Sequence, residues 1–280
     1  MNDRVSEVYK GLLHRKLTQE HLKLRIDWMI SQVRGERVLD VGCSQGITSI
    51  LLAQEGYKVI GIDSDAEAIR YAKNDLDKEP ESVKNRATFL EGNLLDQAFE
   101  ETSFDSIIIG EVIEHLPNPK SLIERCYCLL KKEGKIIITT PFGILQHPDH
   151  FHTYYISNFL ELVSPYFQKN ILEVIGKRIC YQGLKKKQVE QDKKLDYQEL
   201  LRMLIISEEA FLEIENVYLE EIAERKARSL NQQELLQQYR TRLKEKQAQL
   251  NDYREIIKSK QEKLENKQQL ISQYKQEIKE

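Results

Sequence analysis

The chain has 280 residues, of which 40% are hydrophobic and 31% are charged, and this length suits one domain plus an appended segment. No apolar run approaches the roughly 20 residues that a bilayer-spanning helix needs. The polar N-terminus leads into no continuous apolar stretch, which argues against a signal peptide. Composition therefore excludes a membrane span and favours a cytoplasmic location.

The charges are nearly balanced, since 42 basic side chains face 45 acidic ones and give a formal net charge of -3. The chain lacks the basic excess with which proteins neutralise nucleic-acid phosphates, so RNA ranks below small molecules and glycans as a binding partner. The four cysteines form no CxxC pair and are expected to be reduced thiols.

The distribution of glycine and proline marks a boundary, because all of them lie at or before Gly183. These residues are the strongest breakers of regular structure, so everything beyond should be helical. We expect a helical lead-in over 1–34, a globular domain over 35–183, a helical junction over 184–207 and a coiled coil over 208–280.

Within the globular domain, short β-branched runs alternate with helical stretches. This pattern predicts an α/β fold, a Rossmann-like doubly wound sheet of seven mostly parallel strands with helices on both faces. The last two strands should form an antiparallel pair, and the lead-in should either pack on the sheet or cover a ligand site. The expected strands are 37–41, 58–62, 87–90, 106–110, 135–139, 167–175 and 177–182, and the expected helices are 46–55, 65–77, 119–131 and 156–163.

A branched aliphatic residue recurs every seven positions from Leu236 to Ile278. The companion series three residues on is half lysine, which predicts a coiled coil of modest strength or else a single charge-laced helix. A continuous helix over 208–280 would extend on the order of 110 Å. We therefore expect this segment to form a homo-oligomer or to bind a protein partner.

The loop after the first expected strand carries the first chemical signal. Its glycines, Gly42 and Gly46, can let backbone N–H groups approach a ligand closely. Asp63 ends the next strand, where a carboxylate can accept hydrogen bonds from a ribose diol. Ser44 replaces the second glycine of a dinucleotide fingerprint, and the preceding Asp40 would repel a pyrophosphate. The loop thus favours an adenosine cofactor with cationic groups over a nicotinamide dinucleotide.

These motifs resemble the class I S-adenosylmethionine-dependent methyltransferases over about residues 34–183. The resemblance implies that the glycine loop wraps the methionine moiety of S-adenosylmethionine, that Asp63 holds its ribose and that Asn93 contacts its adenine. Many members of the family have Asp in place of Asn93, and an amide can still accept a hydrogen bond from adenine. The residues expected at the cofactor are Asp40, Gly42, Cys43, Gly46, Asp63, Asn93 and Glu111.

Glu111, Glu114 and His115 follow a buried strand at a spacing that puts them on one face of a helical turn. Such a cluster suits a divalent cation such as Mg²⁺. Alternatively, Glu111 receives the ammonium group of the cofactor and the other two only order the turn. The E-x-x-E-H sequence is similar to that of ubiquinone-pathway O-methyltransferases and of enzymes that methylate the 2′-hydroxyl at small-RNA 3′ ends. This similarity implies a metal held by these residues and an acceptor with adjacent hydroxyls.

Three histidines, His147, His150 and His152, fall within six residues after the fifth expected strand. We expect at least one of them to complete the metal site or to act as a general base. The two tyrosines that follow, Tyr154 and Tyr155, either line the acceptor pocket or pack. The expected catalytic residues are Glu111, Glu114, His115, His150 and His152, and the expected metal ligands are Glu111, Glu114, His115 and His150.

Together these features predict a methyltransferase that transfers a methyl group from S-adenosylmethionine to a hydroxyl of a glycan, lipid-linked or small-molecule acceptor. Two alternatives are a small-RNA 3′-terminal 2′-O-methyltransferase and a non-catalytic coiled-coil scaffold with a methyltransferase-like domain. The intact set of motifs favours the enzyme over the scaffold.

Overall fold

The computed structural model describes residues 4–13, 16–143, 149–189, 197–226 and 233–277. The chain divides into two compact units, Met1–Lys194 and Leu195–Glu280. None of the helices in the described ranges is both long enough and apolar enough to cross a membrane.

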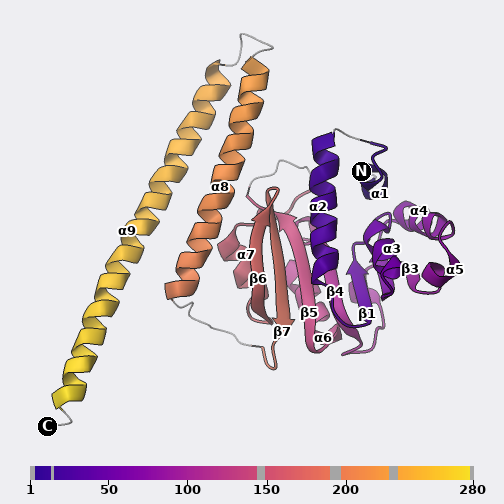
Figure 1. Ribbon diagram of the computed structural model, residues 1–280, viewed down its shortest axis with the longest axis horizontal. Coiled ribbons are helices and arrows are strands. Elements are labelled where there is room, and N and C mark those ends of the chain that lie inside the picture. Colours follow the sequence, from indigo (N-terminus) through magenta and orange to yellow (C-terminus); the bar gives the residue numbers. More distant parts are fainter. Residues whose placement is uncertain (1–3, 14–15, 144–148, 190–196, 227–232, 278–280) are drawn as a thin grey trace. The chain divides into compact units, whose positions relative to one another are not determined.

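The first unit is built on a seven-stranded sheet with the strand order β3-β2-β1-β4-β5-β7-β6 (Figure 1). The first five strands are parallel, and β7 runs antiparallel to both β5 and β6. This confirms the expected doubly wound sheet and its antiparallel closing pair. The strands are β1 (Arg37–Val41), β2 (Lys58–Asp63), β3 (Ala87–Glu91), β4 (Phe104–Gly110), β5 (Leu130–Pro141), β6 (Phe167–Ile175) and β7 (Arg178–Lys185).

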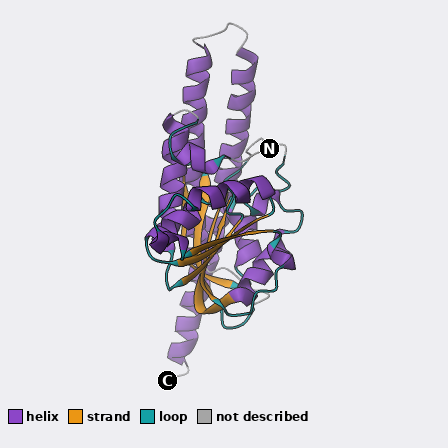
Figure 2. Cartoon of the chain, turned by 90° about the vertical axis from the view of Figure 1, so that its right-hand side faces the viewer, coloured by secondary structure: helices purple, strands orange, loops and turns teal. Residues whose placement is uncertain are grey.

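Helices cover both faces of this sheet (Figure 2). The short helix α5 was not expected from the sequence, whereas the other helices lie close to their expected positions. The helices of this unit are α1 (Val5–Tyr9), α2 (Lys16–Gln32), α3 (Ile47–Gln54), α4 (Ala66–Leu76), α5 (Glu81–Lys84), α6 (Pro119–Leu129) and α7 (Ile156–Val163), with the 3-10 turns η1 (Leu94–Asp96) and η2 (Ile113–His115).

The central strands are apolar on both sides because helices pack on both faces. Ile26 of α2 and Val33, the residue directly after this helix, are fully buried against Val38, Ile108 and Ile137, which belong to three neighbouring strands. The longer helix of the lead-in therefore packs on the sheet, one of the two roles considered for this segment. On the opposite face, the ring of Phe159 in α7 lies 5.3 Å from that of Tyr181 in β7.

The strand order fixes where a ligand can bind. From β1 the chain passes to β2 on one side, and β4 lies on the other side of β1. In open α/β sheets, the loops at such a switch point separate and leave a crevice beyond the carboxyl ends of the strands. The loops after β1, β2 and β4, which carry the motif residues, meet at this edge.

The second unit is a helical hairpin of α8 (Tyr197–Lys226) and α9 (Gln233–Glu277). Its contacts run in opposite directions along the two helices, so the pair is antiparallel. The segment over 208–280 does not form the single extended helix considered from the sequence, because the seven-residue apolar series of α9 packs on α8 of the same chain. The contacts are Glu208 with Arg254, Phe211 with Lys246 and Tyr218 with Tyr239.

Candidate active site

A cavity of about 870 Å³ opens at the switch point of the sheet. Its walls come from the loops after β1, β2, β3 and β4, together with α1, α2 and the start of β7. Most of the residues expected at a cofactor line it, and they are Asp40, Gly42, Cys43, Asp63, Asn93 and Glu111.

The two loop glycines serve different purposes. A Cβ on Gly42 would meet Cγ2 of Val112 at 2.3 Å, so glycine lets the loops after β1 and β4 approach each other. Gly46 is not among the residues that line the cavity, although it was expected at the cofactor. Its φ is +79°, and a Cβ there would lie 2.6 Å from Phe89 and 2.8 Å from Ala72. Gly46 therefore permits close packing at the start of α3.

Asp40 lies at the base of the cavity with 3% of its surface exposed. The Ser49 hydroxyl donates a 2.6 Å hydrogen bond to its Oδ2. Burial raises the pKa of Asp40 to about 6, and the nearby Asp63 carboxylate adds to this shift. The carboxylate is thus held where its negative charge is poorly solvated, which favours a cationic neighbour.

The carboxylate of Asp63 shapes the loop as well as facing the cavity. It accepts hydrogen bonds from the backbone N–H of Ser44 at 2.8 Å and of Asp65 at 2.9 Å. Asn93 plays a similar part, since its Oδ1 accepts a 3.0 Å hydrogen bond from the backbone N–H of Leu95. Each acceptor oxygen keeps a second lone pair, so these bonds leave room for a ligand.

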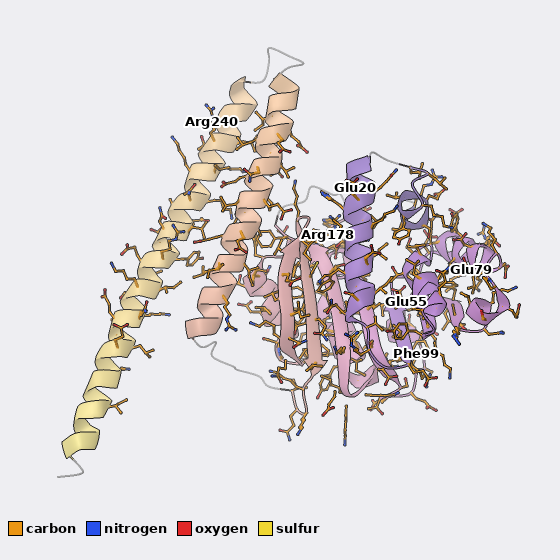
Figure 3. The ribbon with its side chains drawn as sticks, in the orientation of Figure 1. Glu20, Glu55, Glu79, Phe99, Arg178 and Arg240 are labelled. Carbon is orange, nitrogen blue, oxygen red and sulfur yellow. The ribbon has the colours of Figure 1, made fainter. Side chains whose placement is uncertain are left out.

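Glu111 follows β4 in a left-handed backbone conformation with φ +59°, so it does not share a helical turn with Glu114 as the sequence spacing suggested. Two guanidinium groups that the sequence analysis missed hold its Oε2, Arg25 of α2 at 3.2 Å and Arg178 of β7 at 2.9 Å. Figure 3 shows Arg178 beside α2. Oε1 of Glu111 and Nε of Arg25 are buried without a hydrogen-bond partner, and all three residues line the cavity. No sequence pattern around Arg25 or Arg178 indicated a role at this site, because the two residues reach Glu111 only when the chain folds.

Glu114, His115 and His150 form the metal-type cluster among the described residues, with one potential ligand atom from each lying within 4.8 Å of the others. Glu114 is 1% exposed, and burial together with the charge of Glu111 raises its pKa to about 8. The Thr140 hydroxyl donates a 3.0 Å hydrogen bond to Oε2 of Glu114, whereas Oε1 is buried without a partner. The cluster thus contains three of the four expected metal ligands. The fourth, Glu111, is not part of the cluster and instead forms ion pairs with Arg25 and Arg178.

In the loop that carries His147, His150 and His152, the structure gives His150 and His152 different surroundings. Only Asp149 and His150 of its described residues line the cavity. His152 Nε2 lies 3.4 Å from the carbonyl oxygen of Pro117, and Tyr154 is buried with its hydroxyl donating to the Ile113 carbonyl at 3.4 Å. Tyr154 and Tyr155 therefore do not line the pocket, and His147 lies outside the described residues.

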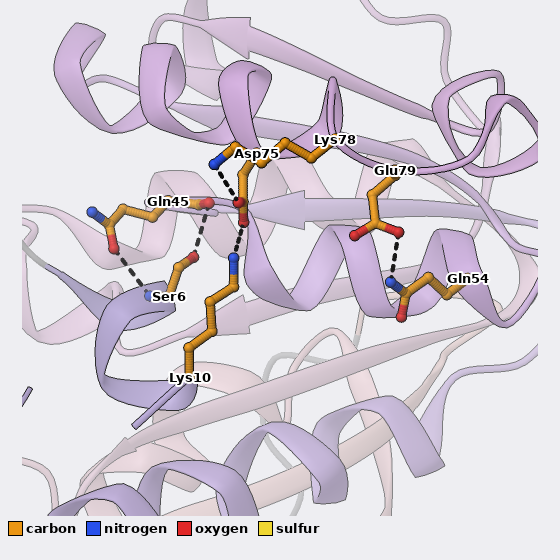
Figure 4. A network of polar contacts seen from close by, with 7 residues as sticks. All are labelled: Ser6, Lys10, Gln45, Gln54, Asp75, Lys78 and Glu79. Atoms are coloured by element: carbon orange, nitrogen blue, oxygen red, sulfur yellow. Dashed lines mark hydrogen bonds and ion pairs between the residues drawn. The ribbon is translucent and has the colours of Figure 1, made fainter. Parts of the chain in front are cut away.

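Helix α1 covers the glycine loop through two polar contacts (Figure 4). The Ser6 backbone N–H donates to the Gln45 side chain, and the Ser6 hydroxyl donates to the Gln45 carbonyl, both at 3.0 Å. Lys10 forms a 2.6 Å ion pair with the buried Asp75 of α4. Val5 and Val8 of this helix line the cavity, so the lead-in covers the site as well as packing on the sheet.

Comparison of the sequence with known proteins relates the first unit to methyltransferases. Residues 39–138 match the family model described as a methyltransferase domain. The chain contains a class I methyltransferase domain. Over 121 residues it is 36% identical to the ubiquinone biosynthesis O-methyltransferase of Actinobacillus pleuropneumoniae serotype 5b (strain L20), a match that covers 42% of this chain and 52% of that relative. The chain thus spans about half the length of the curated relatives it matches.

Solved structures share the fold of the methyltransferase domain. Magnesium protoporphyrin IX methyltransferase (ChlM) from Synechocystis PCC 6803 superposes with a TM-score of 0.56 at 15% identity, over 66% of this chain and 94% of that one. The PH0226 protein from Pyrococcus horikoshii OT3 gives a TM-score of 0.52 at 19% identity, over 62% and 93% of the two chains. At these identities the likeness establishes the fold alone.

Proposed function

We propose that this chain transfers a methyl group from S-adenosylmethionine to a hydroxyl oxygen of a small-molecule, glycan or lipid-linked acceptor. One observation carries the proposal. A single cavity is lined both by the residues expected at the cofactor and by the cluster of Glu114, His115 and His150. A methyl donor and a group that handles a hydroxyl proton must lie this close for direct transfer.

The residues present fit the cofactor. Asp63 offers a carboxylate at the end of β2 for a ribose diol, and the buried Asp40 favours a cationic ligand. Arg25 is a nearly buried cation that can pair with the methionine carboxylate, and the unpartnered Oε1 of Glu111 can accept from the ammonium group. When bound, the cofactor supplies a methyl group on a sulfonium, whose transfer requires in-line positioning and little water.

The residues also fit a divalent cation. A carboxylate oxygen of Glu114 lies within 4.8 Å of a nitrogen of each of the two imidazoles. Oε1 of Glu114 is buried without a hydrogen-bond partner, and Thr140 holds the other carboxylate oxygen in place. Nδ1 of His115 lies 3.0 Å from the Asp149 carbonyl, which can only accept, so Nδ1 carries the proton and Nε2 is the ring nitrogen with a lone pair that can coordinate a metal. One carboxylate with two imidazoles suits Mn²⁺, Fe²⁺ or Zn²⁺ better than the Mg²⁺ expected from the sequence. Such an ion would lower the pKa of an acceptor hydroxyl.

The proposal is tested in two stages on the full chain. Calorimetric titration with S-adenosylmethionine and S-adenosylhomocysteine, with and without Mg²⁺, Mn²⁺ or Zn²⁺, measures cofactor binding. A tritiated-methyl screen against extract separated into small-molecule, lipid, glycan, RNA and protein fractions then identifies the acceptor class. Binding without transfer to any fraction would favour the scaffold, and label found only in RNA 3′ ends would favour the small-RNA enzyme.

The metal part of the proposal has a matched pair of variants in one loop. His150→Ala should abolish metal-stimulated transfer and lower the affinity for Mn²⁺, because it removes one of the three cluster ligands. His152→Ala should keep both properties, since His152 lies outside the cluster. Equal effects of the two substitutions would refute the assignment of His150, and transfer unaffected by chelators would remove the metal while leaving the enzyme.

A further inference from the structure

The helical hairpin exposes an apolar stripe along α8. Ile205, Leu212 and Leu219 are spaced seven residues apart, and each is about half exposed, at 47%, 55% and 54%. Residues at this spacing lie on one face of a helix and typically form the seam of a coiled coil. Three large aliphatic side chains in one row, bordered by glutamates such as Glu208 and Glu209, form an exposed apolar stripe of the kind that proteins usually cover.

A second uncovered surface lies on the far end of α9. Its seven-residue series begins against α8, where Leu250 is half buried and Ile257 is 7% exposed. Further on, Leu264 and Ile271 of the same series are 48% and 53% exposed. The register explains the exposure of Ile271 and puts Leu264 opposite the first turn of α8. Because Glu208 pairs with Arg254, the first residue of α8, eleven positions before Glu208, falls opposite about residue 265, and α9 continues to Glu277.

The two surfaces have opposite charge. Between Arg202 and Ile222 the α8 sequence holds six glutamates and one arginine, whereas 258–277 of α9 holds five lysines and three glutamates. They also cannot meet within one hairpin, because the α8 stripe lies alongside the middle of α9, and the end of α9 extends past the first residue of α8. A partner that carries a matching surface for each of them is another copy of the same chain.

We propose that the hairpin dimerises, with the basic end of α9 of each copy packing on the acidic α8 stripe of the other. The arrangement is two-fold symmetric, so each contact occurs twice. It extends the seam already formed between α8 and α9, because Leu264 and Ile271 continue the row that includes Leu250 and Ile257. It also turns two exposed apolar surfaces into one helical bundle.

Sedimentation equilibrium on the full chain tests the dimer directly, and the expected mass is twice 32.9 kDa. Leu212→Asp and Ile271→Asp should each raise the dimer dissociation constant by about tenfold or more, because each removes a buried aliphatic side chain from two symmetric contacts. Far-ultraviolet circular dichroism should show unchanged helix content. A wild-type chain that stays monomeric at a protein concentration of about 100 µM would overturn the proposal. A dimer that neither substitution weakens would also overturn it.

Charge exchange separates this interface from any other. Lys263→Glu with Lys267→Glu should weaken the dimer, and adding Glu209→Lys with Glu220→Lys to the same chain should restore it, because these glutamates flank the stripe and are exposed. The exposed Arg240, labelled in Figure 3, lies outside both surfaces, so Arg240→Glu should change nothing. Failure of the second pair to rescue the first would refute the pairing of α9 with α8.

Discussion

Replacing Asp40 by asparagine should make the methyltransferase domain more stable at neutral pH. Asp40 is 3% exposed, and its pKa rises from the usual 3.8 to about 6 in the folded protein. A difference of about two pKa units corresponds to about 3 kcal/mol against the ionised form. The amide oxygen of asparagine can still accept the hydrogen bond from Ser49. We therefore expect Asp40→Asn to raise the free energy of unfolding by up to about 3 kcal/mol at pH 8.

The pH dependence gives the sign of the effect. A carboxyl whose folded pKa lies above its unfolded value favours folding most when it is protonated. The wild type should therefore be about as stable as the variant below pH 3.8, should lose stability relative to it as the pH rises from 3.8 to about 6, and should keep that deficit at higher pH. If the buried carboxylate also favours the cationic cofactor, the variant should gain stability while losing affinity for S-adenosylmethionine.

Trp28 makes the measurement specific to the first unit, because it is the single tryptophan of the chain and lies on α2. Urea unfolding followed by its fluorescence, from pH 4.5 to pH 8 in steps of about half a unit, reports the difference between variant and wild type. As a control, Asp75→Asn should destabilise the protein, because Asp75 pairs with Lys10 and Lys78. A difference for Asp40→Asn that does not change with pH, or that has the opposite sign at pH 8, would refute the reasoning.

Two further outcomes follow from the glycine loop and its cover. Gly46→Ala should lower the melting temperature far more than Gly56→Ala, because both glycines have positive φ but only the first would clash, at 2.6 Å with Phe89; differential scanning fluorimetry compares them, and equal shifts would contradict a packing role. Lys10→Met should speed the release of S-adenosylhomocysteine several-fold by freeing α1 from Asp75, at a cost of about 1 kcal/mol for a partly exposed pair. Stopped-flow displacement measures this rate, and an unchanged value would show that α1 does not limit exchange.

The sheet could be predicted from the sequence because its strands are short runs of buried β-branched residues. Ile107 to Ile109 and Ile136 to Ile138 are short continuous apolar runs, which are typical of buried strands and have no helical periodicity. All six residues are fully buried in the structure. The glycine loop was found because Gly42 and Asp63 keep fixed places relative to strand ends. Such local signals predict positions along a chain well, since each depends on a few neighbouring residues.

The parts that could not be predicted depend on contacts between distant segments. Arg25 of α2 and Arg178 of β7 both form ion pairs with Glu111, and no sequence pattern near either arginine predicts these contacts. Glu111 was placed on a helical turn by its spacing, but its left-handed backbone separates it from the cluster. The hairpin was missed for the same reason, because a periodic helix has the same sequence whether its partner is another chain or an earlier segment of its own.

The described residues that line the cavity span Arg4 to Arg178, and all of them belong to the first unit. The residues that shape the pocket are therefore separate in the sequence from those that form α8 and α9. Over evolutionary time the two units can change at different rates, one constrained by the ligands of its cavity and the other by the contacts of the hairpin. A lineage could exchange its hairpin for another without having to reinvent the chemistry.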